Sequence, residues 1–370
     1  MNEEIMSEGT LGRRSFMKRL GLAGAAALPV GALLTGQTRA RGADFGGRLG
    51  AGDAAILRFL AAAELIESDL WTQYAELGGI GTNPPIELDP GQTLNPYQAA
   101  LSNLDPDGPQ YIASNTLDEV SHATFLNAYL ASRGAEPVDL TPFRKLKGST
   151  AAGSTNCLRL TNLMHLNVDT SWFVRYRSET NPDFGATYPQ AVTITNRTAI
   201  PITDSDLNGT VDHIQVIANT AAFHFGYIEQ GGSSLYAAMS QKVTDPEVLQ
   251  VTLGIGGDEI AHFLEWVDFS GNGVQAPVAP VTDQGLTFPN FFNPLNPLIQ
   301  PNLIFPVPCE FISPDVPHVS VIRPLTDKFG GAVATIASFT ADGLFTGQSN
   351  QFLYELQSLA EAADATTRDV

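Results

Sequence analysis

The chain has 370 residues, of which 43% are hydrophobic, and it carries 39 acidic and 20 basic residues. This apolar content is enough for a full core and excludes a disordered protein, and the length indicates one large domain with additions, or two domains. The formal net charge of −19 argues against binding to nucleic acid or anionic lipid, because those partners need clustered Lys and Arg against their phosphates.

Residues 1–42 are predicted to be a targeting signal rather than part of the fold. The stretch GRRSFMK at 12–18 precedes an apolar run at 20–34 that is short for a membrane span;. This pattern resembles a bacterial twin-arginine signal cleaved near Ala40, and the alternative is a basic amphipathic helix or a membrane anchor. The resemblance implies a periplasmic or secreted protein with no membrane span after cleavage. Proteins that take this route often carry a cofactor that was inserted before export.

The mature chain is predicted to be mainly α-helical. Apolar residues recur at spacings of three and four along four long segments, 53–77, 111–133, 211–241 and 245–269;. Gly78 and Gly134 end the first two segments, and Asp245-Pro246 supplies a cap and a first helical proline for the fourth;. At about 1.5 Å per residue, each helix extends ~30 Å or more, which is enough to cross a bundle.

Two regions outside these helices are rich in turn-forming residues. An insertion at about 143–210 contains one further predicted helix, 157–176, and then a Thr/Asn/Pro-rich stretch;. The segment 274–370 is Pro-rich from 277 to 317, which is typical of a chain that wraps a domain or packs on a partner subunit. It ends in a predicted amphipathic helix at 348–363.

The string Asp-Glu-apolar-small-His occurs twice, at 118–122 and at 258–262. A Glu and a His three residues apart lie on one face of a helix, about 4.5 Å apart along its axis, so both can reach one metal ion. A single such pair would be weak support, because helices contain Glu-x-x-His by chance. Two copies on two long helices predict a metal site between them.

The other two long helices each place a glutamate on their apolar stripe. Glu67 precedes Tyr74 by seven residues, and Glu229 precedes Tyr236 by the same spacing. Burying a lone carboxylate costs several kcal/mol, so such a glutamate needs a partner such as a metal ion. Glu64 lies within one turn of the first stripe and is an alternative to Glu67, although the matched spacing favours Glu67.

This arrangement resembles the ferritin-like superfamily. Di-iron and di-manganese carboxylate proteins use one Glu from each of two helices and a Glu-x-x-His pair from each of the other two. The pattern of Glu229, Gly231, Gly232 and Tyr236 is similar to bacterial ferritin-like domain proteins related to plant desiccation-related proteins. The resemblance implies a ferritin-like four-helix bundle at 51–273 that holds two Fe or Mn ions. The implied ligands are Glu67, Glu119, His122, Glu229, Glu259 and His262.

The resemblance also implies partners for the two histidines. Asp118 matches an acidic residue that hydrogen-bonds the ligand histidine of the opposite helix, which here is His262, and Asp258 correspondingly pairs with His122. Such bonds fix the imidazole tautomer and raise its donor strength. The family often has Arg before the histidine, and this chain has small residues there instead.

Three aromatic residues, Trp71, Tyr74 and Tyr236, lie one or two turns from these candidate ligands. An aromatic side chain at this distance can donate an electron or a proton, but core packing is the interpretation that we prefer. The remaining histidines are interpreted as hydrogen-bonded structural residues, namely His165, His213, His224 and His318.

A separate acidic stretch, 204–212, matches the first nine positions of an EF-hand-like calcium loop and leads directly into the helix 211–241;. Position twelve is Gln215, so the bidentate acidic ligand is missing. The alternative to calcium binding is an Asx/Gly turn that caps the helix. The candidate calcium ligands are Asp204, Asp206, Asn208 and Asp212.

The two cysteines, Cys157 and Cys309, lie far apart in the sequence. In an exported chain they can form a disulfide or remain free thiols, and the sequence leaves both open. No short-spaced cysteine motif indicates a zinc or iron–sulfur site.

Three functions fit these patterns. A metal pair held by carboxylates and imidazoles can bind and reduce oxygen or peroxide, as an oxidoreductase would, and its mixed O and N ligands suit iron or manganese. A non-catalytic scaffold, for stress or desiccation protection or for metal binding alone, is the second. Iron storage in a cage is a weaker third, because the long insertion and the Pro-rich tail do not suit a subunit of a shell. The sequence leaves the reaction and any homo-oligomer open.

Overall fold

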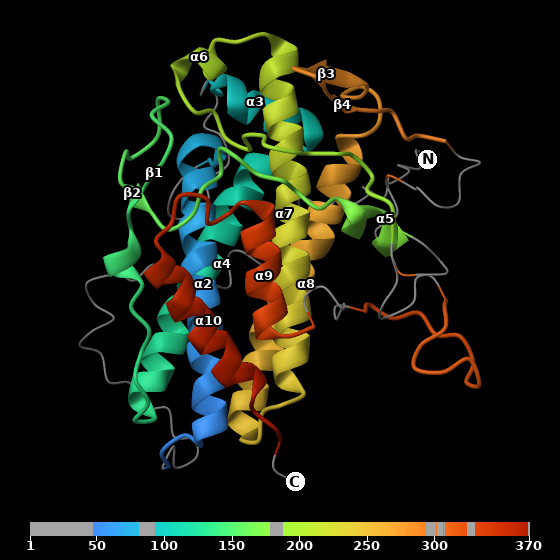
Figure 1. The fold of residues 1–370 in the computed structure, drawn as a ribbon. Coiled ribbons are helices and arrows are strands. Elements are labelled where there is room, and N and C mark those ends of the chain that lie inside the picture. The colour runs from blue at the N-terminus through green and yellow to red at the C-terminus, as the bar shows by residue number, and fades with distance from the viewer. Residues whose placement is uncertain are drawn as a thin grey trace, which may run out of the picture. The chain divides into compact units, whose positions relative to one another are not determined.

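The computed structural model describes the part of the chain that follows the predicted signal, and residues 1–42 lie outside the described residues. Described are residues 47–80, 93–177, 188–293, 301, 306, 308–323 and 330–368. This part is mainly helical, as predicted (Figure 1). None of the described helices is both long enough and apolar enough to cross a membrane.

Four long helices lie side by side along most of their length (Figure 1). They are α2 (Ala51–Gly78), α4 (Gly108–Ser132), α7 (Val211–Ser240) and α8 (Pro246–Asn272). Helix α2 packs mainly against α4, α7 packs mainly against α8, and α4 also contacts α8. Their bounds lie within a few residues of the predicted segments, because apolar periodicity and end signals are local properties of the sequence.

Capping residues begin two of these helices. Thr210 accepts a hydrogen bond from the backbone N–H of His213 at the start of α7, and Asp245 accepts one from Glu247 N at the start of α8, where Pro246 is the first helical residue. Both caps satisfy N–H groups that have no partner inside a helix. Helix α7 is enclosed because shorter elements pack on the faces that α8 leaves open.

The helix predicted at 157–176 in the insertion is wrong for most of that range. Among its described residues, it contains a short antiparallel pair, β1 (Leu146–Lys147) and β2 (Leu158–Arg159), and two short helices, α5 (Ser171–Arg177) and α6 (Asp204–Leu207). The carboxylate of Asp69 on α2 accepts hydrogen bonds from the N–H groups of Leu160 and Thr161 at 2.9 Å each. These distant bonds replace the local i to i−4 bonds of a helix, so the apolar periodicity was misleading here.

Several short elements complete the described chain. The capping box of Asn95 and Gln98 begins α3 (Pro96–Leu104), which lies between α2 and α4 in the sequence. Helix α10 matches the helix predicted at 348–363, whereas α9 was not predicted. The strands β3 and β4 pair with Val281 opposite Phe288. The bounds are α3 (Pro96–Leu104), η1 (Thr141–Phe143), α6 (Asp204–Leu207), β3 (Val281–Asp283), β4 (Leu286–Phe288), α9 (Ala332–Asp342) and α10 (Asn350–Asp364).

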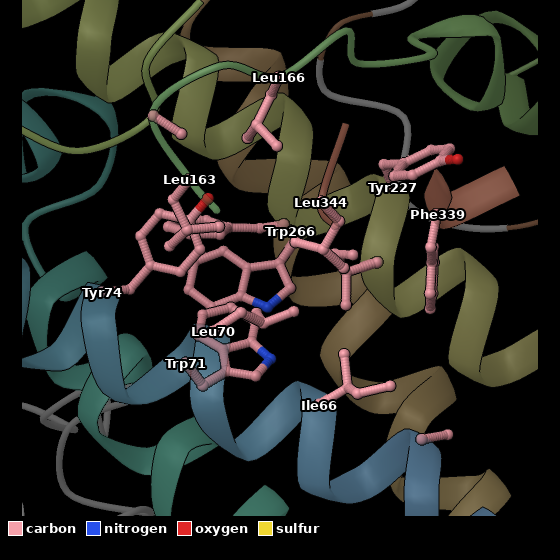
Figure 2. Packing of buried hydrophobic residues seen from close by; sticks show 14 of the residues in the cluster. Ile66, Leu70, Trp71, Tyr74, Leu163, Leu166, Tyr227, Trp266, Phe339 and Leu344 are labelled. Carbon is pink, nitrogen blue, oxygen red and sulfur yellow. The ribbon is translucent and has the colours of Figure 1, made fainter. Parts of the chain in front are cut away.

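One core joins the long helices to the insertion and to the C-terminal helices. Figure 2 shows Trp71 and Trp266 packed together, with Leu163 from the insertion and Leu344 from the C-terminal segment close by. Helices α9 and α10 pack against each other, α10 packs on α2, and α9 contacts α7. The additions therefore cover the outer faces of α2 and α7.

Candidate metal centre

Four glutamates and two histidines from the four long helices meet between those helices. Glu64 comes from α2, Glu229 from α7, and the two Glu-x-x-His pairs come from α4 and α8. The glutamates are at most 1% exposed, and the histidines are 8% and 5% exposed. We call these residues the core cluster: Glu64, Glu119, His122, Glu229, Glu259 and His262.

The core cluster contains two overlapping sets of ligand atoms. In each set, one donor atom from every residue lies within 4.8 Å of all the others. Glu119 belongs to both sets, so the two sets share one carboxylate. The first set is Glu64, Glu119, His122 and Glu259, and the second is Glu119, Glu229 and His262.

Both histidines direct Nδ1 into the cluster and Nε2 towards its edge. His122 Nδ1 lies 3.3 Å from Glu119 Oε2 and 3.4 Å from Glu64 Oε2, while its Nε2 lies 3.2 Å from Asp258 Oδ2. The hydrogen bond with His122 lowers the pKa of Asp258. An ionised aspartate only accepts, so Nε2–H donates to it, and Nδ1 would offer its lone pair to a cation that displaces its proton.

His262 has the same arrangement on the other side of the centre. Its Nδ1 lies 3.2 Å from Glu119 Oε1 and 3.4 Å from Glu229 Oε2, and its Nε2 lies 3.4 Å from Asp118 Oδ2. The crossed pairing of each aspartate with the histidine of the opposite helix is therefore confirmed. The side chains of Asp118 and Asp258 are each 44% exposed, so the centre borders solvent between α4 and α8.

Each glutamate of the core cluster has at least one carboxylate oxygen that lacks a hydrogen-bond donor among the described residues. Among the described residues, Glu64 Oε2, Glu119 Oε1, Glu229 Oε2 and both oxygens of Glu259 are buried and accept no hydrogen bond. Buried anionic oxygens are costly unless a cation or proton compensates them. The lone pair of a deprotonated Nδ1 would also be repelled by these oxygens unless a cation lay between them. The donor set therefore fits positively charged metal ions.

The pKa values describe how protons would compensate this charge. Burial raises the pKa of Glu64 to about 7, and burial together with Glu119 raises that of Glu259 well above its usual range. Burial by itself would lower the pKa of His122, but its hydrogen bonds, that with Asp258 foremost, raise it to about 12. Protons held this strongly occupy the places that metal ions would take.

Helix α2 contributes Glu64, rather than Glu67, to these sets. Glu67 is also buried, and burial and the nearby Glu119 raise its pKa, but it belongs to neither set among the described residues. Trp71 Nε1 donates to Glu229 Oε1 at 3.0 Å, and the Tyr236 hydroxyl donates to Glu64 Oε1. Glu64 of α2 is thus followed seven residues later by Trp71, which donates to Glu229. Glu229 of α7 is followed seven residues later by Tyr236, which donates to Glu64.

This reciprocal pairing is a signal that the comparison of spacings in the sequence did not use. The sequence comparison paired Glu229 and Tyr236 with Glu67 and Tyr74 because the residue types and the spacing are the same. In the structure, the residues that correspond to Glu229 and Tyr236 by their hydrogen bonds are Glu64 and Trp71. The relevant property is an aromatic hydrogen-bond donor two turns on, which indole N–H and phenol O–H both supply.

The acidic stretch at 204–212 is occupied by structural hydrogen bonds. Asp206 Oδ2 accepts from the N–H groups of Ile202 at 2.7 Å and Thr203 at 3.0 Å, as part of a capping box that begins α6. Its Oδ1 lies 3.1 Å from His213 Nε2, and His213 Nδ1 lies 2.8 Å from Asp283 Oδ2. These bonds favour the capping interpretation. We call the following residues the loop cluster: Asp204, Asp206, His213 and Asp283.

The cysteines do not form a disulfide in the described part of the chain. Cys157 is exposed and Cys309 is buried, and both are free thiols. Neither thiol belongs to the groups of described residues that could hold a metal ion.

Comparison with known proteins gives no assignment. No family model, curated protein or solved structure matches the chain. What the core cluster binds is therefore inferred from its own geometry and chemistry.

Proposed function

We propose that this chain is an exported ferritin-like protein whose four-helix bundle binds two iron or manganese ions. The observation that carries this proposal is the convergence of two imidazole Nδ1 atoms on four buried glutamates, each with at least one oxygen that accepts no hydrogen bond from the described residues. Carboxylate oxygens and imidazole nitrogens together suit iron or manganese. Helix α2 would supply Glu64 in place of Glu67. The remaining ligands would be Glu119, His122, Glu229, Glu259 and His262.

The position of the centre supports redox chemistry with small oxidants. The half-exposed Asp118 and Asp258 line one edge of the centre, while the glutamates behind them are fully enclosed. Small oxidants such as oxygen or peroxide are the substrates that suit a centre whose glutamates are buried this completely. A pair of redox-active ions would supply electrons there, and the chain would hold the histidines and exclude water from the inner carboxylates.

Elemental analysis tests the proposal directly. Full-length protein that has folded in the cytoplasm of its native cell should contain about two Fe or Mn ions per chain. A Glu119→Gln/Glu259→Gln variant keeps the shape of both side chains but removes their charge, and it should lose the metal. Glu265→Gln is the matched control, because Glu265 lies on α8, burial raises its pKa to about 8, and it lies outside both ligand sets.

The same measurement separates this proposal from its alternative. Two ions in the parent protein and in Glu265→Gln, but none in the double variant, would make oxygen and peroxide assays the next step. Metal-free protein in every case would mean that protons neutralise the core cluster. A non-catalytic scaffold in stress or desiccation protection would then be preferred.

Single variants decide which glutamate of α2 binds metal. Glu64→Gln should weaken metal binding, because Glu64 belongs to a ligand set, and Glu67→Gln should weaken it less. The reverse order would restore Glu67 as the ligand.

A further inference from the structure

A second chain of buried polar side chains lies next to the core cluster. The Tyr74 hydroxyl lies 2.7 Å from His224 Nδ1, and His224 Nε2 lies 3.1 Å from Asp342 Oδ2. Tyr74 and His224 are 0% exposed and Asp342 is 2% exposed. The three residues come from α2, α7 and α9, so the bundle and the C-terminal segment build this chain together.

The directions of these hydrogen bonds follow from the groups involved. If Asp342 is ionised it can only accept, and His224 then carries its proton on Nε2 while its Nδ1 accepts the phenolic hydrogen of Tyr74. Burial raises the pKa of Tyr74 well above its usual range, so the phenol is protonated. A carboxylate behind the imidazole stabilises the imidazolium that forms if His224 takes the proton, as in a catalytic triad.

Packing alone does not account for this partner. Two other buried tyrosines, Tyr97 and Tyr227, satisfy their hydroxyls with the backbone carbonyls of Ala199 and Ser338. Backbone carbonyls do not accept a proton at neutral pH, whereas imidazole does. Tyr74 is thus placed against a base that is itself held by an acid.

Aromatic rings connect Tyr74 to the core cluster. The ring centroids of Tyr74 and Trp71 are 5.7 Å apart, and Trp71 Nε1 donates to the candidate ligand Glu229 at 3.0 Å. Trp71 also stacks on Trp266 with a centroid distance of 5.4 Å. Figure 2 shows Tyr74, Trp71 and Trp266 gathered in one part of the core. The described structure thus provides a continuous contact path from the phenol to the metal centre.

We propose that Tyr74 is a redox-active tyrosine that supplies an electron to the metal centre through Trp71 while its phenolic proton moves to His224. This inference rests on the proposed function, because the oxidant would be the oxygen or peroxide that the metal pair would reduce. One electron leaves the phenol and reduces that oxidant, and the O–H bond breaks as an N–H bond forms at Nδ1. The products are a neutral tyrosyl radical and an imidazolium that is paired with the Asp342 carboxylate. An external one-electron reductant, together with return of the proton, restores Tyr74.

The regions added to the bundle hold this chain in place. Asp342 is the last residue of α9, and Gly343 follows it with φ of +90°, a conformation that favours glycine;. The N–H of Asn167 in the insertion donates to the carbonyl of Asp342 at 2.7 Å. Asp342 is therefore a positioning residue that both additions fix against His224.

Light-driven oxidation tests Tyr74 without relying on the metal. A ruthenium photo-oxidant is attached to Cys157, which is exposed while Cys309 is buried. The hydroxyl of Thr155 contacts Cys157 Sγ and donates a hydrogen bond to Glu76. Because Glu76 lies on α2, two residues after Tyr74, the label is close to this helix. After a flash, electron paramagnetic resonance of the full chain should show a tyrosyl radical with and without metal.

Matched variants separate a redox role from a structural one. Tyr74→Phe should abolish this radical, and Tyr97→Phe should leave it unchanged. His224→Gln can still accept from the phenol and donate to Asp342, but an amide does not take up the proton, so oxidation should slow roughly 100-fold. Asp342→Asn should slow it less.

The outcomes distinguish this inference from the proposed function. Metal-loaded protein given peroxide should form the same radical, and Tyr74→Phe should lack it. Peroxide consumption without a Tyr74 radical, or equal rates in His224→Gln and the parent, would overturn the inference and leave the metal centre standing. Absence of metal in the purified protein would overturn the proposed function, whereas the light-driven radical would still assign Tyr74 and His224.

Discussion

The core cluster and the loop cluster are both rich in acidic side chains, yet they differ in what their oxygens contact. In the loop cluster, backbone N–H groups donate to Asp206, and Ala152 N donates to Asp204 Oδ1 at 2.7 Å. In the core cluster, each of the four glutamates has at least one buried oxygen that accepts no hydrogen bond from the described residues. Residue type and spacing suggested metal for both. The supply of donors distinguishes a helix cap from a site that requires cations.

The largest expected effect comes from crowding the core cluster without changing its ligands. A Cβ on Gly232 of α7 would lie 2.0 Å from Glu259 Oε2, so Gly232→Ala must displace this carboxylate. We expect loss of most bound metal by elemental analysis. Gly254→Ala on α8 is the control, because no described atom lies within 4 Å of its added Cβ. It should keep the metal and gain roughly 0.5–1 kcal/mol of stability. Full metal content in Gly232→Ala would contradict the assignment of Glu259.

Local sequence patterns were sufficient for the long helices and for the two Glu-x-x-His pairs. A glutamate and a histidine three residues apart share a helix face whatever the rest of the chain does. Distant contacts decided the remainder. In segment 157–176, Leu160 and Thr161 donate hydrogen bonds to the carboxylate of Asp69 instead of forming the helix that the apolar periodicity predicted. Glu64, and not Glu67, belongs to a ligand set, and the hydrogen bonds that Trp71 donates to Glu229 and Tyr236 donates to Glu64 are distant contacts of this kind.

The core cluster should also make the stability of the metal-free chain depend on pH. Glu64 has a pKa of about 7 in the folded chain and 4.5 as the ordinary value. Between these values the metal-free folded chain binds more protons than the unfolded chain, so stability falls as pH rises. The loss is about 3 kcal/mol for this group. His122, with its pKa raised to about 12, adds a loss of the same sign above pH 6.5.

Denaturant unfolding at several pH values measures this slope. We expect metal-free protein to lose stability from pH 4.5 to 7, and Glu64→Gln to lose less. Metal ions replace the protons, so the loaded protein should gain stability over the same range. A metal-free protein whose stability rises throughout this range would contradict buried, protonated carboxyl groups in the core cluster.

A smaller effect is expected at the edge of the core cluster. Asp118 Oδ2 lies 3.4 Å from His262 Nε2 and orients this imidazole. Removing such a partner typically weakens metal binding about 10- to 100-fold. Titration of Asp118→Ala with Fe²⁺ or Mn²⁺ should show this change. Asp212→Ala removes an exposed charge in the first turn of α7 and should leave the affinity unaltered. Equal affinities in both variants would mean that the aspartate does not act through the histidine.

The smallest effect is expected in the loop cluster, and it should involve stability alone. Asp206→Ala removes the acceptor for two backbone N–H groups, which costs about 1 kcal/mol for the loss of a cap;. The midpoint of thermal unfolding should fall by roughly 2 °C, with the metal content unchanged. Calcium should not raise the midpoint of the parent protein, because a ligand stabilises only the state that it binds. A calcium-dependent rise that Asp206→Ala abolishes would place a cation in the loop cluster after all. It would also show that backbone donors and a metal ion can share these carboxylates, so that the supply of donors would no longer separate the two clusters.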